Sequence, residues 1–183
     1  MDALGSFMNN HDNSRWLSNY PGNIPGFKNA ITFAMTARGI PFFYYGDEQE
    51  FSGGNDPANR ESLWNAMDTS SDVYQYVAKI NKARKSAQVW NFPYVERYVL
   101  DHFFSFSKGD MVVMTPNKWD TINIDMPYHP YEDGTEVCNI FWADVDCQVV
   151  TGGILKAHLQ SGEAKIYLPK SNIYFADQMN PMQ

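Results

Sequence analysis

The hydrophobic positions in the first half of the chain predict alternating strands and helices. Residues 4–8 read as a short apolar strand. Apolar residues then recur at helical spacing from Phe27 to Met35, which predicts a helix that runs to Arg38 and ends at Gly39. The next run, residues 40–45, is apolar on both faces, as in a parallel strand that helices cover. Strand, helix and strand in this order form a βαβ unit.

A second helical pattern follows a glycine-rich loop. It begins near residues 70–72, and its apolar stripe comprises Val73, Tyr76, Val77, Ile80, Ala83 and Ala87. The pattern of strand, helix, strand and helix then stops. Two such units leave the edges of their sheet uncovered, whereas a closed barrel of this type needs eight. We therefore expect this half to be the end of a longer domain or to be completed by a partner.

From about Val89 the pattern changes to short β-rich runs separated by turn residues. These runs are residues 94–100, 103–107, 111–115, 121–126, 136–141, 147–151, 154–159 and 164–169. In one of them Ile122, Ile124 and Met126 alternate with polar residues, which predicts a strand with one solvated face. Several such strands in succession indicate an antiparallel sandwich. The predicted domains are therefore residues 1–88, of α/β type, and residues 89–183, of all-β type.

A polar cluster follows the first predicted strand directly, in the segment "FMNNHDNSRW" of residues 7–16. Asn and Asp favour turns and cap helices, so the cluster could be a simple turn. Functional side chains also gather on loops just past a rigid strand, so it could equally be a site. These ten residues alone leave both interpretations open.

Composition and charge argue against some partners. A formal net charge of −7 and a pI near 4.9 disfavour nucleic-acid binding, which needs a basic face. No apolar run reaches the roughly 20 residues that span a bilayer, and no signal peptide is visible after Met1. Aromatic residues make up 15% of the chain, which suits a protein that stacks rings against the C–H faces of sugars.

The cysteines and histidines give weaker signals. Cys138 and Cys147 lie close together in the strand-rich half, as a hairpin disulfide or as two separate buried thiols, and we favour the disulfide. His102, His129 and His158 have no metal-ligand spacing, so we predict no metal site there.

Two segments resemble a known family. "LGSFMNNHDNSRW" resembles the segment after the seventh barrel strand in the α-amylase family of glycoside hydrolases, with its Asn-His-Asp core. "GIPFFYYGDEQEFSGGNDPANRESLW", residues 39–64, is similar to the eighth strand and following loop of fungal-type α-amylases. The resemblance implies that residues 1–88 are the last two βα units of a TIM (β/α)8 barrel. It also implies that residues 89–183 form an antiparallel Greek-key β-sandwich domain.

The resemblance also implies an activity and roles for four residues. The family cleaves α-1,4-glucans such as starch, glycogen and maltooligosaccharides with retention, using a carboxylate nucleophile and a carboxylic acid. By this resemblance Asp12 is a third catalytic carboxylate, which contacts the hydroxyls of the sugar being cleaved, and His11 is its sugar-binding neighbour. Asp56 and Arg60 match positions that contact a more distant glucose.

Other parts of the family's machinery are expected outside this sequence. The nucleophile and general acid follow the fourth and fifth barrel strands, and the Ca²⁺ ligands come from a domain inserted earlier in the barrel. We therefore expect the chain to be inactive alone and to work with the missing N-terminal barrel portion. The family also implies an extracellular or a lysosomal or vacuolar location.

Several neighbouring residues are expected to be structural. Asn9, Asn10 and Asn13 should position the loop, and Glu48 should not be the general acid. For three aromatic residues, core packing is favoured over sugar stacking: these are Trp16, Tyr45 and Trp64. Two other functions compete with a starch-degrading enzyme, namely a non-catalytic glucan-binding module and an amylase-like structural subunit of a larger assembly.

Overall fold

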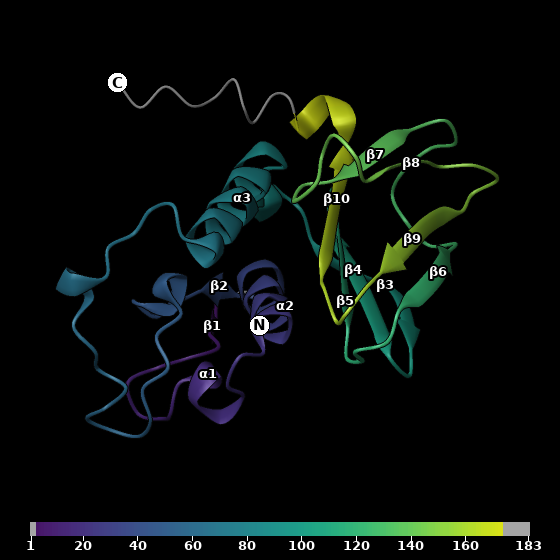
Figure 1. Ribbon diagram of the computed structural model, residues 1–183. Helices are drawn as coiled ribbons and strands as arrows, with labels where there is room; N and C mark the ends of the chain where they lie inside the picture. The colour runs from purple at the N-terminus through teal and green to yellow at the C-terminus, as the bar shows by residue number, and fades with distance from the viewer. Residues whose placement is uncertain (1–2, 174–183) are drawn as a thin grey trace. The chain divides into compact units, whose positions relative to one another are not determined.

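The computed structural model describes residues 3–173 and divides into two compact units, Met1–Ala78 and Lys79–Gln183 (Figure 1). This division falls within helix α3 (Asp72–Ser86), and the domain boundary at residue 88 remains a prediction. Among the described residues, no helix combines the length and the apolar character that crossing a membrane requires.

The first unit is built around a parallel pair of strands, as the βαβ pattern predicted. Its elements before α3 are β1 (Gly5–Ser6), α1 (Trp16–Asn19), α2 (Ile24–Thr36), β2 (Ile40–Pro41), η1 (Asp47–Gln49) and η2 (Leu63–Asn65). Gly5 pairs with Ile40 and Ser6 with Pro41. Both strands are shorter than the predicted runs, because each has only one paired neighbour within the described residues and Pro41 has no N–H to donate.

Helix α2 is fixed by its N-terminal cap and its apolar face. The Asn23 side chain accepts a hydrogen bond from the Gly26 N–H, and Phe27 and Ile31 are buried. The helix ends at Thr36, two residues before the predicted end at Arg38. Gly39 does not close it: its φ is +98°, and a Cβ there would lie 2.4 Å from the Leu4 carbonyl oxygen. The glycine is therefore required by the close approach of β1 and β2.

The predicted second helix is confirmed as α3. Its start is held by the Ser71 hydroxyl, which accepts a hydrogen bond from the Tyr74 N–H, and by an ion pair between Lys28 and Asp72. The predicted apolar stripe faces inward, with Val73 and Ile80 fully buried.

The eight predicted β-rich runs of the second unit are all strands. After η3 (Val89–Asn91) these are β3 (Tyr94–Leu100), β4 (Phe103–Lys108), β5 (Met111–Pro116), β6 (Ile122–Met126), β7 (Glu136–Asn139), β8 (Cys147–Val149), β9 (Leu155–Leu159) and β10 (Lys165–Pro169). Six form an antiparallel sheet in the order β3-β4-β5-β10-β7-β8, and β6 pairs with β9 as a separate ribbon. Apolar side chains from both layers, such as Met114, Met126 and Leu155, form one buried cluster. An antiparallel two-layer arrangement is thus confirmed.

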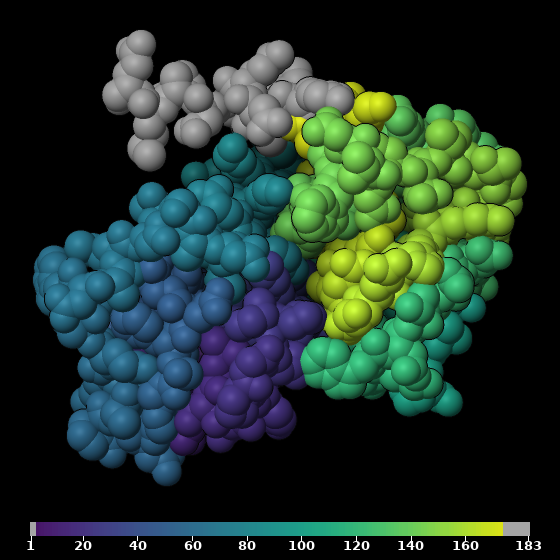
Figure 2. All heavy atoms as spheres, viewed as in Figure 1, coloured from purple at the N-terminus to yellow at the C-terminus, as the bar shows by residue number. Residues whose placement is uncertain are grey.

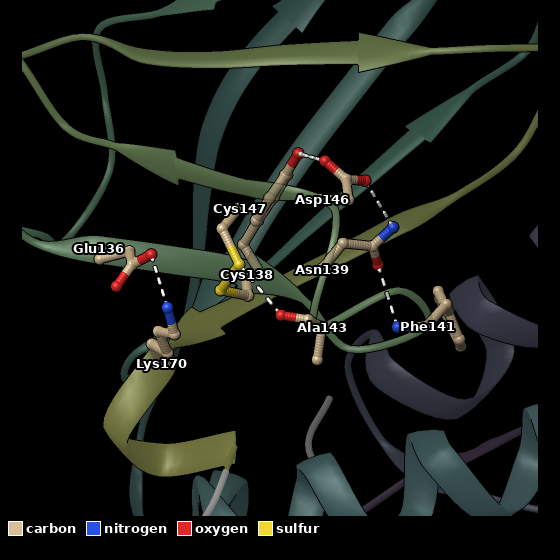
Figure 3. The surroundings of a disulfide bond; sticks show 9 residues. Glu136, Cys138, Asn139, Phe141, Ala143, Asp146, Cys147 and Lys170 are labelled. Atoms are coloured by element: carbon tan, nitrogen blue, oxygen red, sulfur yellow. Dashed lines mark hydrogen bonds and ion pairs between the residues drawn. A yellow bond between two sulfur atoms is a disulfide. The ribbon is translucent and has the colours of Figure 1, made fainter.

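The disulfide prediction is also confirmed. Cys138 on β7 and Cys147 on β8 are bonded and lie directly opposite each other (Figure 3). The enclosed loop is tied further by the Asn139 amide, which donates to the Asp146 carboxylate, itself paired with Lys165. The strand ends and the loop between them are therefore braced at several points.

Candidate active-site loops

The loop after β1 presents His11 and Asp12 to solvent. The Asn10 side-chain oxygen accepts hydrogen bonds from the backbone N–H groups of Asp12 and Asn13, at 2.9 and 3.1 Å, which forms a tight turn. His11 Nε2 lies 3.3 Å from Asp12 Oδ1, and the two side chains are 63% and 71% exposed. Both can therefore reach a ligand, while Asn10 and Asn13 shape the turn as predicted.

A second loop presents Asp56 and Arg60. The Arg60 Nε lies 2.8 Å from Asp56 Oδ1, and both side chains are about half exposed. The peptide bond between Asp56 and Pro57 is cis. This pair offers a carboxylate acceptor beside a guanidinium donor, a combination that suits hydroxyl groups.

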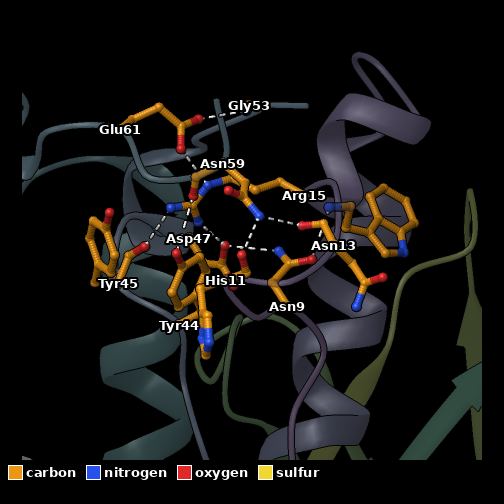
Figure 4. Close-up of polar contacts among 11 residues, drawn as sticks. Asn9, His11, Asn13, Arg15, Tyr44, Tyr45, Asp47, Gly53, Asn59 and Glu61 are labelled. Atoms are coloured by element: carbon orange, nitrogen blue, oxygen red, sulfur yellow. Dashed lines mark hydrogen bonds and ion pairs between the residues drawn. The ribbon is translucent and has the colours of Figure 1, made fainter. Parts of the chain in front are cut away.

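Asn59 joins the two loops. Its side chain is fully buried, and its Nδ2 donates to the carbonyl oxygens of His11 and Asn13, at 2.9 and 2.8 Å (Figure 4). At the edge of this contact the Ser14 hydroxyl donates to the Asn55 side chain. Figure 2 shows the N-terminal segment (purple) lying against the segment of residues 40–60 (blue). The structure thus brings the loops of all four predicted site residues together.

Arg15 anchors both loops from beneath. Its side chain is fully buried, and its guanidinium donates to the Asp47 carboxylate, the Glu61 carboxylate and the Tyr45 carbonyl, at 2.9, 2.7 and 3.0 Å (Figure 4). The guanidinium also lies over the Tyr44 ring, 4.4 Å from its centroid. One side chain therefore links the loop after β1 to four residues between positions 44 and 61.

The neighbours of Arg15 complete this polar core. The Asn9 amide donates to Asp47 Oδ1 at 2.8 Å, and its oxygen accepts from the Trp16 N–H. The remaining Glu61 oxygen accepts from the Gly53 N–H. Asn9 therefore positions the loop, as predicted, and does not face a ligand.

The two carboxylates around Arg15 differ in their pKa. Burial raises the pKa of Asp47 to about 6, although the hydrogen bond from Asn9 and the charge of Arg15 lower it. Partial burial also raises the pKa of Glu61, but hydrogen bonds from backbone N–H groups and from Arg15 outweigh that effect, so its pKa lies below the ordinary value. The Arg15 core is therefore sensitive to pH through Asp47.

Sequence reasoning did not find Arg15, Asp47 or Glu61. Arg15 is separated from these partners by 32 and 46 residues, so no local pattern reveals the contacts. The available signal was weak: Asp47 follows the second predicted strand, and Glu61 lies in the segment of residues 39–64 that resembles fungal-type α-amylases.

The aromatic predictions are corrected in part. Trp64 was expected in the core, but it is 83% exposed, and none of the η2 residues is buried. Trp16 packs against the rings of Tyr20 and Phe27. Tyr45 is 38% exposed, so only part of its ring contacts protein.

No calcium ligand set is found in residues 3–173. The one group of three metal-capable side chains there is Glu136, Cys138 and Cys147, whose sulfurs are bonded to each other. Ca²⁺ takes six to eight oxygen ligands, so this group does not fit it.

Comparison with known proteins gives consistent matches. Residues 2–95 match the family model described as "Alpha amylase, catalytic domain". An α-amylase of Saccharomycopsis fibuligera is 31% identical over 91% of this chain and 34% of its own length. A β/α-amylase of Paenibacillus polymyxa is 32% identical over 89% of this chain and 14% of its own length.

Solved structures agree with these matches. An α-amylase from Malbranchea cinnamomea superposes with a TM-score of 0.85 and 28% identity, over 94% of this chain and 38% of its own. An α-amylase from Geobacillus thermoleovorans, solved with acarbose, gives a TM-score of 0.72 and 26% identity, over 90% and 38%. The chain thus spans little more than a third of these structures.

Proposed function

Because this chain belongs to the α-amylase family of glycoside hydrolases, we propose that it is the C-terminal portion of a retaining α-amylase that hydrolyses internal α-1,4 bonds of starch and glycogen. In this proposal residues 1–88 are the last two units of the (β/α)8 barrel, and residues 89–183 are the Greek-key β domain. The observation that carries it is the exposed His11–Asp12 pair, held by Asn59 against the loop of Asp56 and Arg60.

The proposed chemistry divides between this chain and the rest of the barrel. Retaining hydrolysis needs a nucleophile and a general acid about 5–5.5 Å apart, and we assign both to the preceding barrel portion. Asp12 accepts hydrogen bonds from hydroxyls of the sugar at the cleavage point, which strengthen as the ring distorts towards the transition state. His11 lies beside it and can donate to a neighbouring hydroxyl. Asp56 and Arg60 bind a glucose further along the chain.

The parallel strand pair supports a preceding barrel portion. Leu4, Phe7, Ile40 and Phe42 are each more than half exposed, on or next to β1 and β2. Apolar residues beside open strand edges indicate a surface that other strands and helices cover. We propose that the remaining barrel units, in the same polypeptide or as a partner, occupy it and hold the family's Ca²⁺.

We also propose that the protein is extracellular or resides in a lysosome or vacuole, and the disulfide supports this location. A cross-strand disulfide persists in oxidising compartments, which suits an extracellular protein or one in a lysosome or vacuole.

A reconstitution experiment tests the proposed function. The chain is mixed, or co-expressed, with the first six βα units of a fungal α-amylase, and release of reducing ends from soluble starch is measured. We expect activity only in the combined protein, and its loss with Asp12→Asn. Hydrolysis by the chain alone would contradict the division of roles. Glucan binding without hydrolysis in a properly assembled complex would instead identify a binding module.

A further inference from the structure

The disulfide between β7 and β8 has an acidic neighbour. Val137 belongs to the buried core of the second unit, so Glu136 and Cys138, on either side of it along β7, share the opposite face of the strand. Cys147 of β8 lies directly across from Cys138. One carboxylate oxygen of Glu136 and both sulfurs lie within 4.8 Å of one another (Figure 3). Two sulfurs and an oxygen therefore gather around one point.

The Glu136 carboxylate is held in place and is open to solvent. Its Oε1 lies 2.8 Å from Nζ of Lys170, just after β10, and the two side chains are 43% and 38% exposed. Because a carboxylate has two oxygens, one can stay with Lys170 while the other takes a second partner. Cys147 is half-buried and Cys138 is fully buried. The group can therefore be reached from the side of Glu136.

Reduction of the disulfide would turn its two sulfurs into metal ligands. A dithiol reductant gives up two electrons and two protons and closes into its own disulfide. The bond between Cys138 and Cys147 breaks, and each sulfur takes up one proton. The thiolates that these thiols form are soft ligands, which favour zinc over calcium or magnesium. Zinc binds cysteine sulfur and glutamate oxygen in tetrahedral geometry, and water can fill the fourth position.

We propose that Cys138 and Cys147, once reduced, bind a zinc ion together with Glu136. At Zn–S bonds of about 2.3 Å, tetrahedral ligands stand roughly 3.8 Å apart, so the sulfurs separate and the carboxylate oxygen moves by about 1 Å or less. Binding releases the two thiol protons. The charges of two thiolates, a carboxylate, zinc and the Lys170 ammonium sum to zero, so the assembled group is neutral.

The zinc site and the disulfide exclude each other, because both use the same two sulfurs. The disulfide persists in an oxidising compartment. Under reducing conditions the metal would tie β7 to β8 at the same point, and ligand binding to the folded form stabilises it. Zinc would thus replace the cross-strand link for as long as the disulfide is absent. This inference is independent of the proposed glucan hydrolysis.

Cobalt binding by the reduced full chain tests the site. The protein is reduced with a dithiol, separated from it under argon and titrated with Co²⁺, whose absorption reports thiolate ligands and tetrahedral geometry. The chain contains two cysteines, so charge transfer from thiolate to cobalt can arise only at this site. We expect one tetrahedral cobalt ion per reduced chain, displaced by zinc, and no charge-transfer band in the disulfide form. Absence of the band in the reduced chain would overturn the proposal.

Variants identify the third ligand. Loss of a partner that merely orients a metal ligand costs 10–100-fold in affinity, so Glu136→Gln should weaken zinc binding by at least about tenfold. The matched control is Glu96→Gln, an exposed glutamate on β3 at the far end of the same sheet, which should bind zinc as the wild type does. Lys170→Gln breaks the ion pair but keeps all three ligands, so the tetrahedral cobalt spectrum should persist. Equal zinc affinity in Glu136→Gln and Glu96→Gln would refute the three-ligand site.

Discussion

Replacing Arg15 by Met should loosen both active-site loops. The substitution keeps the length of the side chain but removes the guanidinium. Within residues 3–173, the Asp47 side chain, which is 2% exposed, then keeps only the Asn9 amide as a side-chain partner. Breaking a buried ion pair by removing one partner costs about 3–5 kcal/mol. Because about 1.4 kcal/mol corresponds to a factor of ten, amide exchange in both loops should accelerate by roughly two to four orders of magnitude.

The assay is hydrogen exchange of the full chain, read by mass spectrometry for peptides covering residues 9–15 and 53–61. Peptides from β4 and β5, in the second unit, serve as the internal reference. Arg38→Met removes an exposed arginine of the same unit and should change exchange little. Arg15→Lys should fall between the two, because one ammonium keeps the charge but not the three-way fork.

The effect of Arg15→Met should depend on pH. Burial raises the pKa of folded Asp47 to about 6, above the value of 3.8 for an unperturbed carboxyl, so the folded state binds more protons between these values. The stability that this group contributes is therefore present below about pH 4 and is lost as pH rises through 6. Without Arg15 the charged form of Asp47 is disfavoured further. The amide exchange rate of the variant, divided by that of the wild type, should therefore be larger at pH 8 than at pH 5. Equal exchange in Arg15→Met and Arg38→Met at pH 8 would refute the anchoring role of Arg15.

Three further predictions concern the rest of the chain. Protein recovered from an oxidising compartment should show no free thiol under denaturing conditions, and two free thiols would contradict the pairing. Replacing both cysteines, Cys138→Ala with Cys147→Ala, should lower the unfolding free energy of the β unit by about 2–3 kcal/mol, measured in urea. Leu4→Lys with Phe42→Lys should reduce self-association of the isolated chain in light scattering, and unchanged scattering would argue against the exposed strand edges as its cause. Limited proteolysis should cut first in the exposed turn of residues 20–22 and leave a resistant fragment that begins near Val89, whereas uniform resistance would mean that the first half is closed by itself.

Local patterns predicted the second unit well, because alternation and turn residues act over a few positions. Ile122, Ile124 and Met126 face inward as their spacing indicated, and all eight runs became strands. In the first unit the limits of β1 and β2 depend on neighbouring strands, which the sequence of the strand itself does not encode. Helix α2 stops before Gly39, since the approach to the Leu4 carbonyl sets that position.

The candidate site was predictable only where a local motif carried it. The Asn10 turn and the exposed His11 and Asp12 follow from a polar cluster after a strand. The burial of Arg15 does not, because a charged residue is expected at the surface unless distant partners such as Asp47 and Glu61 compensate its charge. The exposure of Trp64 was missed for the opposite reason, since hydrophobicity alone favours burial.

The bond that Asn59 makes to the neighbouring loop has an evolutionary consequence. Both of its acceptors are main-chain carbonyls, of His11 and Asn13, and every amino acid supplies such a carbonyl. Side chains at positions 11 and 13 can therefore be exchanged over time without breaking the link, provided that the turn is kept. Position 59 has no such freedom, because it must supply an N–H donor. An aspartate there would place a carboxylate oxygen, which only accepts, against the two carbonyl oxygens of His11 and Asn13. Mutations can thus retune what the first loop recognises while its spacing from the second loop is inherited unchanged.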